Sequence, residues 1–176
     1  MSQYRQKNMK YVIFQTKWGY FGLAGTESCL WRTQLPVKKP ETIKSLFLKE
    51  FSDAHLDKNL FKNLQKQVID YFEGKKVHFN TDISVFLDGF TEFQRHILHA
   101  CRNITLGRIV TYADLAQKTG HLNAGRAVGN TLAKNPVPLI IPCHRVIRSD
   151  GKLGGFSAPG GTNLKKRFLM HEKHIL

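Results

Sequence analysis

The stretch VPLIIPCHRVI, residues 137–147, decides how this chain is interpreted, because it sets a thiol, a base and a cation in an apolar, proline-containing segment. Burying such groups costs free energy unless each finds a partner, so packing alone explains Cys143, His144 and Arg145 poorly. We interpret this stretch as the reactive centre of the protein.

Three chemistries could use Cys143 beside His144. A zinc site of the deaminase type would need a second thiol at the position of Val146, and neither Cys29 nor Cys101 has a Cys or His partner at zinc-finger spacing. No metal is therefore expected. A cysteine hydrolase and a thiolate that attacks an alkyl carbon both remain open.

Both remaining chemistries require a thiol pKa below the usual value of about 8.5, and His144 and Arg145 are the candidate groups nearest to the sulfur in the sequence. Helical spacing over residues 162–176 places Glu172 on the same side as the apolar Phe168. A carboxylate that points inward needs a partner, so Glu172 is expected to orient His144. The alternative is an exposed glutamate at the end of a helix.

The composition is typical of a soluble globular protein with a large excess of positive charge. The 176 residues are 41% hydrophobic and 23% charged, and the formal net charge is +14. Residues 1–90 carry 14 basic and 9 acidic side chains, whereas residues 91–176 carry 13 and 4. This bias favours a polyanionic partner, nucleic acid before an anionic membrane surface. A basic protein without such a partner is the alternative.

The cysteine content and the absence of long apolar runs predict an intracellular protein with no membrane partner. Three cysteines cannot form a complete disulfide framework, so reduced thiols are expected. No apolar run approaches the roughly 18 residues of a membrane span, and the first residues, MSQYRQK, lack the pattern of a secretory signal. The expected compartment is the cytoplasm in a prokaryote and the nucleus in a eukaryote.

The first half of the chain mixes strand and helix patterns. Apolar residues 11–14 and 20–24 flank Lys17-Trp18-Gly19, which predicts a β-hairpin, and residues 28–33 fit a third strand. After Pro40 the spacing becomes helical. One expected stripe comprises Ile43, Leu46, Phe47 and Phe51.

A second helix is expected from Asp57 to about Phe72, with Gly74 as its stop. Its stripe comprises Leu60, Phe61, Leu64, Val68, Tyr71 and Phe72. Such an aromatic stripe is more typical of a core than of a ligand site. The turn formers at residues 80–82 and 88–89, together with the shift in charge balance there, indicate a domain boundary near residues 80–90.

The second half is expected to be mainly helical. Residues 91–94 and 111–114 both have capping-box spacing, and each precedes an apolar helical pattern. Gly107 and Gly120 allow turns. Two short helices joined by such a turn suggest helix-turn-helix geometry.

The second of these short helices is expected to run from a cap at Asn123 to about Lys134. Its inner stripe is expected to comprise Ala124, Ala127, Val128 and Leu132. On another face, Arg126, Asn130 and Lys134 follow one another at four-residue intervals. Gly125 and Gly129 leave this face thin, which suits a groove of DNA; an ordinary solvated face is the alternative.

The residues around Cys143 resemble the active-site motif of the O6-alkylguanine-DNA alkyltransferase family, whose members repair DNA by accepting the alkyl group themselves. The motif is PCHRV at residues 142–146. GRIVTY at 107–112, RAVG at 126–129, NPVP at 135–138 and HE at 171–172 follow the family's order at close to its spacing. The resemblance is strong over residues 90–173 and only general over residues 1–85.

The resemblance implies an α/β N-terminal domain over residues 1–85, of ribonuclease-H-like type, and a mainly α C-terminal domain over residues 86–176 with a helix-turn-helix and the active-site cysteine. It also implies that Cys143 takes the alkyl group from O6 of a flipped guanine, with no cofactor. His144 would act as general base through a water, and Glu172 would hold it. Asn135 would brace the turn before the cysteine, and Tyr112 would donate a proton or hydrogen bond to the departing guanine.

The same resemblance implies that the partner is double-stranded DNA with O6-alkylguanine, bound through the minor groove. Arg126 would fill the gap that the flipped nucleotide leaves. The residues expected to contact DNA are Thr111, Tyr112, Arg126, Ala127, Gly129, Asn130 and Lys134. Those expected to contact or shape the pocket for the base are Pro138, Arg145, Val146, Phe156 and Ser157. Flipping is required because O6 of a stacked guanine lies on the major-groove side, away from any buried thiol.

The product on sulfur would be a thioether, which has no leaving group that water displaces readily, so one protein molecule would repair one lesion. A monomer without an obligate protein partner is expected. Cooperative binding along DNA, activity on O4-alkylthymine and the choice between methyl and bulky adducts are left open. The segment Ala158-Pro159-Gly160-Gly161 is longer and more flexible than in some relatives, which bears on that choice.

Two other functions account for part of the sequence. A binding module that recognises alkylated bases without repairing them would resemble relatives that carry tryptophan in place of the acceptor thiol, and Cys143 argues against it. A Cys-His hydrolase of an amide or ester would not explain the basic helix that carries Arg126 and Lys134.

Overall fold

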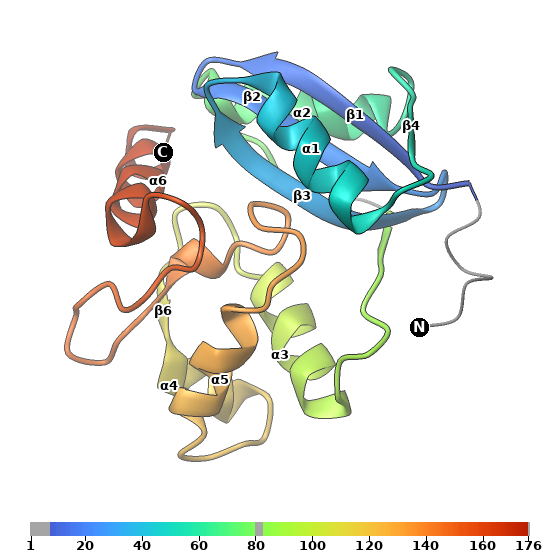
Figure 1. Ribbon diagram of the computed structural model, residues 1–176. Coiled ribbons are helices and arrows are strands. Elements are labelled where there is room, and N and C mark those ends of the chain that lie inside the picture. The colour runs from blue at the N-terminus through green and yellow to red at the C-terminus, as the bar shows by residue number, and fades with distance from the viewer. Residues whose placement is uncertain (1–7, 80–82, 176) are drawn as a thin grey trace. The chain divides into compact units, whose positions relative to one another are not determined.

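The computed structural model describes residues 8–79 and 83–175, which group into two compact units that divide between Phe86 and Leu87 (Figure 1). The fold is mixed α/β. The turn formers Asn80-Thr81-Asp82 lie outside the described residues. Among the helices described, none has the length and apolar character that crossing a membrane would take.

The first unit is built on a five-stranded sheet with the order β4-β1-β2-β3-β5. The strands are β1 (Lys10–Thr16), β2 (Gly19–Gly25), β3 (Cys29–Val37), β4 (His55–Leu56) and β5 (Ser84–Val85). β2 pairs antiparallel with β1 and β3, whereas β4 and β5 add to the two edges in parallel. The hairpin and the third strand predicted from the sequence are confirmed.

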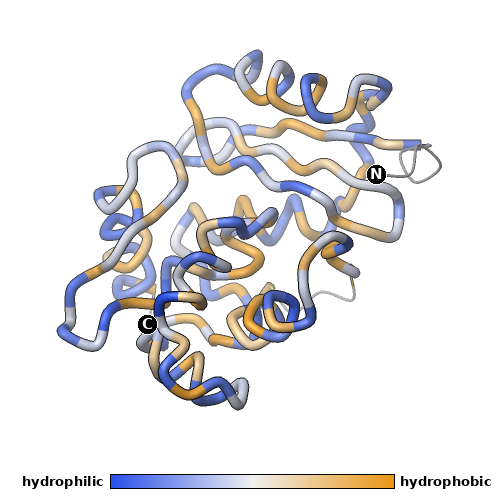
Figure 2. The backbone as a smooth tube through the Cα atoms, turned by 60° about the horizontal axis from the view of Figure 1, so that its bottom comes forward, coloured by the Kyte–Doolittle hydropathy of each residue, from blue (hydrophilic) through white to orange (hydrophobic). Residues whose placement is uncertain are grey.

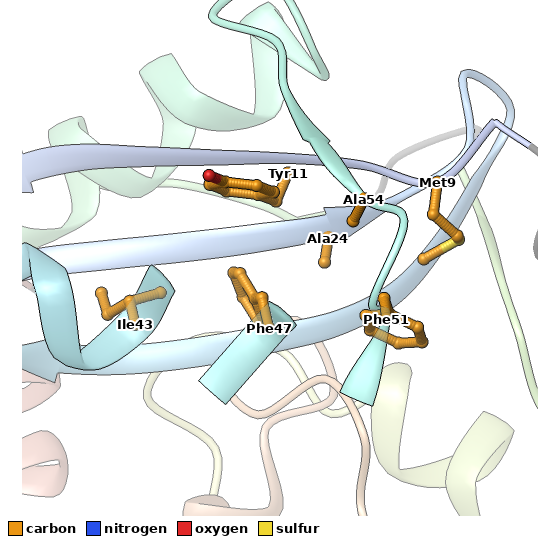
Figure 3. Packing of buried hydrophobic residues seen from close by; sticks show 7 residues of the cluster. All are labelled: Met9, Tyr11, Ala24, Ile43, Phe47, Phe51 and Ala54. Carbon is orange, nitrogen blue, oxygen red and sulfur yellow. The ribbon is translucent and has the colours of Figure 1, made fainter. Parts of the chain in front are cut away.

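Helix α1 (Pro40–Glu50) covers one face of this sheet. Figure 3 shows Ile43 and Phe47 of this helix against the strands, and burying each stabilises the fold by roughly 1.5–3 kcal/mol. The helix packs so closely on β2 that a Cβ at Gly22 would lie 2.5 Å from Ile43 Cγ2. Leu46, placed on the apolar stripe from the sequence, is instead 46% exposed, whereas Ile43, Phe47 and Phe51 of that stripe are buried as expected.

Helix α2 (Lys62–Phe72) packs on the opposite face, where Phe21 of β2 contacts Phe72. Alternation along β2 directs Gly22 toward α1 and Phe21 toward α2. The helix begins five residues later than the expected start at Asp57. The carboxylate of Asp57 accepts a hydrogen bond from the Asn59 amide at 2.8 Å, and Phe61 adopts a left-handed φ of 54°, so the chain turns before it coils.

The second unit contains four α-helices and a short parallel strand pair among its described residues. These are α3 (Glu92–Arg102), α4 (Tyr112–Lys118), α5 (Gly125–Leu132), α6 (Gly161–Ile175), β6 (Val110–Thr111) and β7 (Val146–Ile147). Both expected capping boxes are present, Thr91 with Gln94 at α3 and Thr111 with Asp114 at α4. Figure 2 shows hydrophobic and hydrophilic stretches alternating along the helices, as half-buried helices require.

Helix α5 departs from expectation at both ends. Asn123 does not cap it: the residue lies in the left-handed region at φ 61°, and Ala124 occupies the N-cap position without a side-chain hydrogen bond. The helix ends at Leu132 rather than near Lys134. Its buried side is formed by Val128, Thr131 and Leu132, whereas Ala127, expected on the inner stripe, is exposed.

Candidate active site

The segment that carries Cys143 runs through the interior of the second unit. Val137, Leu139, Ile140 and Ile141 are all buried, and the chain then enters a short 3₁₀ helix over Cys143–Arg145. Cys143 is 8% exposed. The apolar run seen in the sequence therefore anchors the thiol within the protein and leaves it a narrow route to solvent.

Asn135 ties this segment to the end of α5. Its amide nitrogen donates to the Ile141 carbonyl at 2.8 Å and to Cys143 Sγ at 3.3 Å. Its amide oxygen accepts from the Val137 backbone N–H at 3.0 Å. One side chain thus fixes the turn and also supplies a donor to the sulfur.

His144 and Arg145 both meet Glu172 of α6 in the interior. The distance from His144 Nε2 to Glu172 Oε1 is 2.8 Å, and Arg145 Nη2 approaches the same oxygen at 2.8 Å. The guanidinium also donates to the Ile104 carbonyl at 2.5 Å. Because all three side chains are buried, each charge depends on the others for compensation.

The protonation states of this group follow from its contacts. Burial raises the pKa of Glu172, but hydrogen bonds from His144 and Arg145 and their charges outweigh burial and lower it to about 2. Burial lowers the pKa of His144, against the opposing effect of Glu172. An ionised carboxylate only accepts hydrogen bonds, so Nε2 carries the proton and the Nδ1 atom of neutral His144 keeps a lone pair.

Lys165 is a buried cation of this site that sequence reasoning missed. It lies on the inner side of α6 with no exposed surface. Its ammonium donates to the carbonyls of Val146 and Leu153, both at 2.6 Å, and to the phenolic oxygen of Tyr112 at 3.3 Å. These contacts use all three donors of the ammonium. Burial lowers the pKa of Lys165 to about 8, while the nearby thiols Cys143 and Cys101 oppose this shift.

The thiol itself differs from what the sequence led us to expect. Burial raises the pKa of Cys143, and the hydrogen bond from Asn135, the charge of Lys165 and the adjacent backbone N–H groups pull the pKa back down. The side chains that favour the thiolate are therefore those of Asn135 and Lys165. The side chains of His144 and Arg145, expected in this role, are engaged by Glu172 instead.

A cavity of about 890 Å³ reaches the sulfur. Buried Cys143 lies at its base, and exposed Arg126, Asn130 and Arg148 form its mouth. Tyr112 lines it as well, and the ring lies 3.8 Å or more from where a Cβ at Gly129 would stand. The two glycines of α5, Gly125 and Gly129, thus face this cavity and Tyr112.

The expected pocket and DNA residues separate into two groups. Tyr112, Arg126, Gly129, Asn130, Phe156 and Ser157 line the cavity together with Cys143. Pro138, Arg145 and Val146 do not line it, since Arg145 pairs with Glu172 and the Val146 carbonyl is taken by Lys165. Ala127 and Lys134 are exposed on or just after α5, and Thr111 caps α4. No cluster of three or more metal-ligating side chains occurs within residues 8–79 and 83–175.

This geometry defines a protein of mixed α/β fold with a buried cysteine at the base of a cavity. The family model described as "6-O-methylguanine DNA methyltransferase, DNA binding domain" matches residues 92–174. A methylated-DNA–protein-cysteine methyltransferase from Metallosphaera sedula is 38% identical over 141 residues, which cover 80% of this chain and 86% of that protein. The corresponding protein from Methanosarcina barkeri is 35% identical over 169 residues, 96% of this chain and 99% of the relative.

A solved structure extends the comparison to the fold. The crystal structure of Mycobacterium tuberculosis OGT in complex with DNA superposes with a TM-score of 0.75 at 30% identity, covering 94% of each chain. The chain belongs to the methylated-DNA–protein-cysteine methyltransferase family.

Proposed function

We propose that this protein repairs DNA by transferring an alkyl group from O6-alkylguanine to Cys143 in a single turnover. The observation that carries the proposal is the position of Cys143 Sγ, which receives a hydrogen bond from Asn135 at the base of an 890 Å³ cavity beside the buried His144–Glu172 pair. The family membership and the DNA-bound structure of a relative support DNA as the partner.

The first step is removal of the thiol proton. Glu172 fixes Nε2 of His144 as the donor, so the lone pair on Nδ1 is the base, and a water between it and Cys143 carries the proton. The charge of Lys165 and the Asn135 hydrogen bond stabilise the thiolate that results. Burial raises the pKa of the Cys143 thiol. The thiolate therefore forms when His144 can accept the proton and the alkyl group is bound in the cavity.

In the second step the sulfur attacks the alkyl carbon, a carbon–sulfur bond forms and the carbon–O6 bond breaks. The electron pair passes to the guanine ring, which needs a proton. The Tyr112 oxygen accepts from Lys165, so its own O–H is free to point into the cavity and donate to the ring. Water does not hydrolyse the thioether on Cys143, so the protein is permanently inactivated.

Base flipping and DNA docking complete the proposal. A cysteine that is 8% exposed reaches guanine O6 only when the nucleotide leaves the stack. We assign α4 and α5 to a helix-turn-helix that enters the minor groove, with Arg126 of α5, exposed at the mouth of the cavity, in the vacated stack. The sheet of the first unit, with α1 and α2 on its two faces, fits a ribonuclease-H-like domain.

The test is to incubate the protein with duplex DNA that carries O6-methylguanine and to measure the mass of the intact protein. One added methyl per molecule, mapped to Cys143 and never exceeding one equivalent, is expected. Repeated turnover or binding without a gain in mass would overturn the proposal in favour of a hydrolase or a binding module. Cys143→Ala is expected to lose transfer and to keep DNA binding.

A further inference from the structure

The loop after β7 places a second arginine at the mouth of the cavity. Arg148, Ser149 and Asp150 line the cavity, and Arg126 and Arg148 are the two cations among its described lining residues. A Cβ at Gly154 would lie 3.0 Å from the Tyr112 hydroxyl and 3.4 Å from Arg148 Cγ. Gly154 therefore packs against both the stem of Arg148 and Tyr112, the group assigned above to the guanine ring.

In the free protein this arginine is held by a carboxylate. Arg148 Nη2 lies 3.0 Å from Asp150 Oδ2, and Arg148 Nε donates to Asp150 Oδ1 at 3.2 Å. Lys152 Nζ lies 3.9 Å from the same carboxylate. Asp150 is the one carboxylate among the described residues that line the cavity. Since both partners are exposed, this ion pair contributes little to stability, and Arg148 can exchange the carboxylate for another anion at little cost.

A nucleotide that flips into a pocket carries its own phosphates to the mouth of that pocket, because base, sugar and phosphate are covalently joined. Two parallel N–H donors of a guanidinium match a phosphate as well as they match a carboxylate. With Arg126 assigned to the base stack, Arg148 is the cavity cation left to meet this phosphate.

We infer that Arg148 binds a phosphate next to the flipped nucleotide, and that Asp150 holds the guanidinium at the mouth of the cavity until DNA displaces it. The inference rests on the proposed function and adds a substrate-positioning contact to it. The ion pair between Arg148 and Asp150 is exchanged for one between Arg148 and the phosphate, so no covalent bond changes.

The experiment measures the second-order rate of methyl transfer to Cys143 from duplexes in which one phosphodiester flanking O6-methylguanine, 5′ or 3′, is replaced by an uncharged methylphosphonate. For the natural protein, one of the two replacements is expected to slow transfer by about tenfold, the size of a charge-assisted contact. Arg148→Gln is expected to be about tenfold slower on the natural duplex and insensitive to that same replacement.

Three controls make the outcome specific. Arg108→Gln removes an exposed arginine outside the cavity lining and is expected to keep the full sensitivity to the methylphosphonate. Reaction of Arg148→Gln with free O6-benzylguanine, which has no phosphate, is expected at the rate of the natural protein, and this shows an intact site. Asp150→Asn keeps an oxygen for the Lys152 amide but loses the charge, and is expected to bind the natural duplex about threefold more tightly.

The inference is overturned if Arg148→Gln responds to both replacements as the natural protein does, or if Asp150→Asn leaves DNA affinity unchanged. Failure of the proposed function has a different signature, because the natural protein would then gain no methyl from any duplex.

Discussion

Lys165 donates a hydrogen bond to the phenolic oxygen of Tyr112 at 3.3 Å from a side chain that has no exposed surface. The same ammonium holds the carbonyls of Val146, just after the cysteine segment, and of Leu153, in the loop that follows β7. A single cation from α6 therefore joins the acceptor thiol's segment, the cavity loop and the proposed proton donor.

Lys165→Met keeps an unbranched side chain only one atom shorter and removes the charge and the donors. Without that charge the pKa of Cys143 is expected to rise, because Lys165 is one of the groups that lower it. The rate of methyl transfer at neutral pH is expected to fall by about tenfold or more, since a charge in a site with little water strongly stabilises a nearby thiolate. The measurement is the pH dependence of Cys143 alkylation by iodoacetamide, with Lys166→Met, on the exposed side of α6, as the matched control. An unchanged profile would remove Lys165 from the chemistry.

Sequence patterns predicted the local structure that short-range rules control. The capping boxes at Thr91 and Thr111, the hairpin around Lys17-Trp18-Gly19 and the inward position of Glu172 all follow from residues close in the chain. The late start of α2 was missed because the Asp57 side chain bonds the Asn59 amide and competes with helix formation.

Lys165 was missed for a different reason. It stands beside Lys166 and Arg167, and a basic run is usually solvated, so the spacing of 165, 168 and 172 along one side of the helix was overlooked. The three acceptors that compensate its charge come from residues 112, 146 and 153, which only the fold brings together. Which groups lower the thiol pKa was unpredictable for the same reason.

Glu172→Gln is expected to destabilise the second unit by about 3 kcal/mol, because it leaves Arg145 buried without a counter-charge. Tryptophan fluorescence would report on the first unit, which holds both Trp18 and Trp31. The stability of the second unit is therefore measured by hydrogen exchange of the amides in residues 87–175. As a control, Glu92→Gln replaces an exposed residue at the start of α3. It is expected to change the free energy of unfolding derived from exchange by less than about 0.5 kcal/mol. Equal effects of the two changes would contradict the compensation argument.

The pH dependence of stability follows from the same carboxylate. The folded pKa of Glu172, about 2, lies below its ordinary value of 4.5, so its contribution is complete above pH 4.5 and is lost as pH falls toward 2. The second unit of the natural protein should therefore lose protection across this window. Glu172→Gln should lose less protection there, and an identical acid response of the two proteins would argue against the low pKa.

Asn135→Leu tests the contribution of Asn135 to the thiol separately from that of Lys165. The change removes the donor to Cys143 Sγ and leaves the Val137 amide without its partner, at a cost of roughly 1–3 kcal/mol, while the Ile141 carbonyl keeps its bond from the Cys143 N–H at 2.8 Å. The Cys143 pKa is expected to rise and alkylation at neutral pH to slow by about tenfold. Asn130→Leu, on the exposed side of α5, tests whether any loss of amide near the cavity has this effect. If both variants keep the natural alkylation profile, the hydrogen bond to sulfur has no chemical role.

Arg126→Ala tests the stack-filling role without touching the thiol. The side chain is exposed on the first turn of α5, where it lines the mouth of the cavity. Repair in duplex DNA is expected to slow by about a hundredfold, because an unfilled gap leaves the few kcal/mol of unstacking uncompensated. Reaction with free O6-benzylguanine has no stack to fill and is expected to stay within about twofold of the natural rate. The comparison is made by measuring both rates on the same preparation, with Lys134→Ala as a matched loss of one exposed cation just after α5. Equal losses on the duplex and on the free base would place Arg126 in the pocket chemistry instead of the base stack.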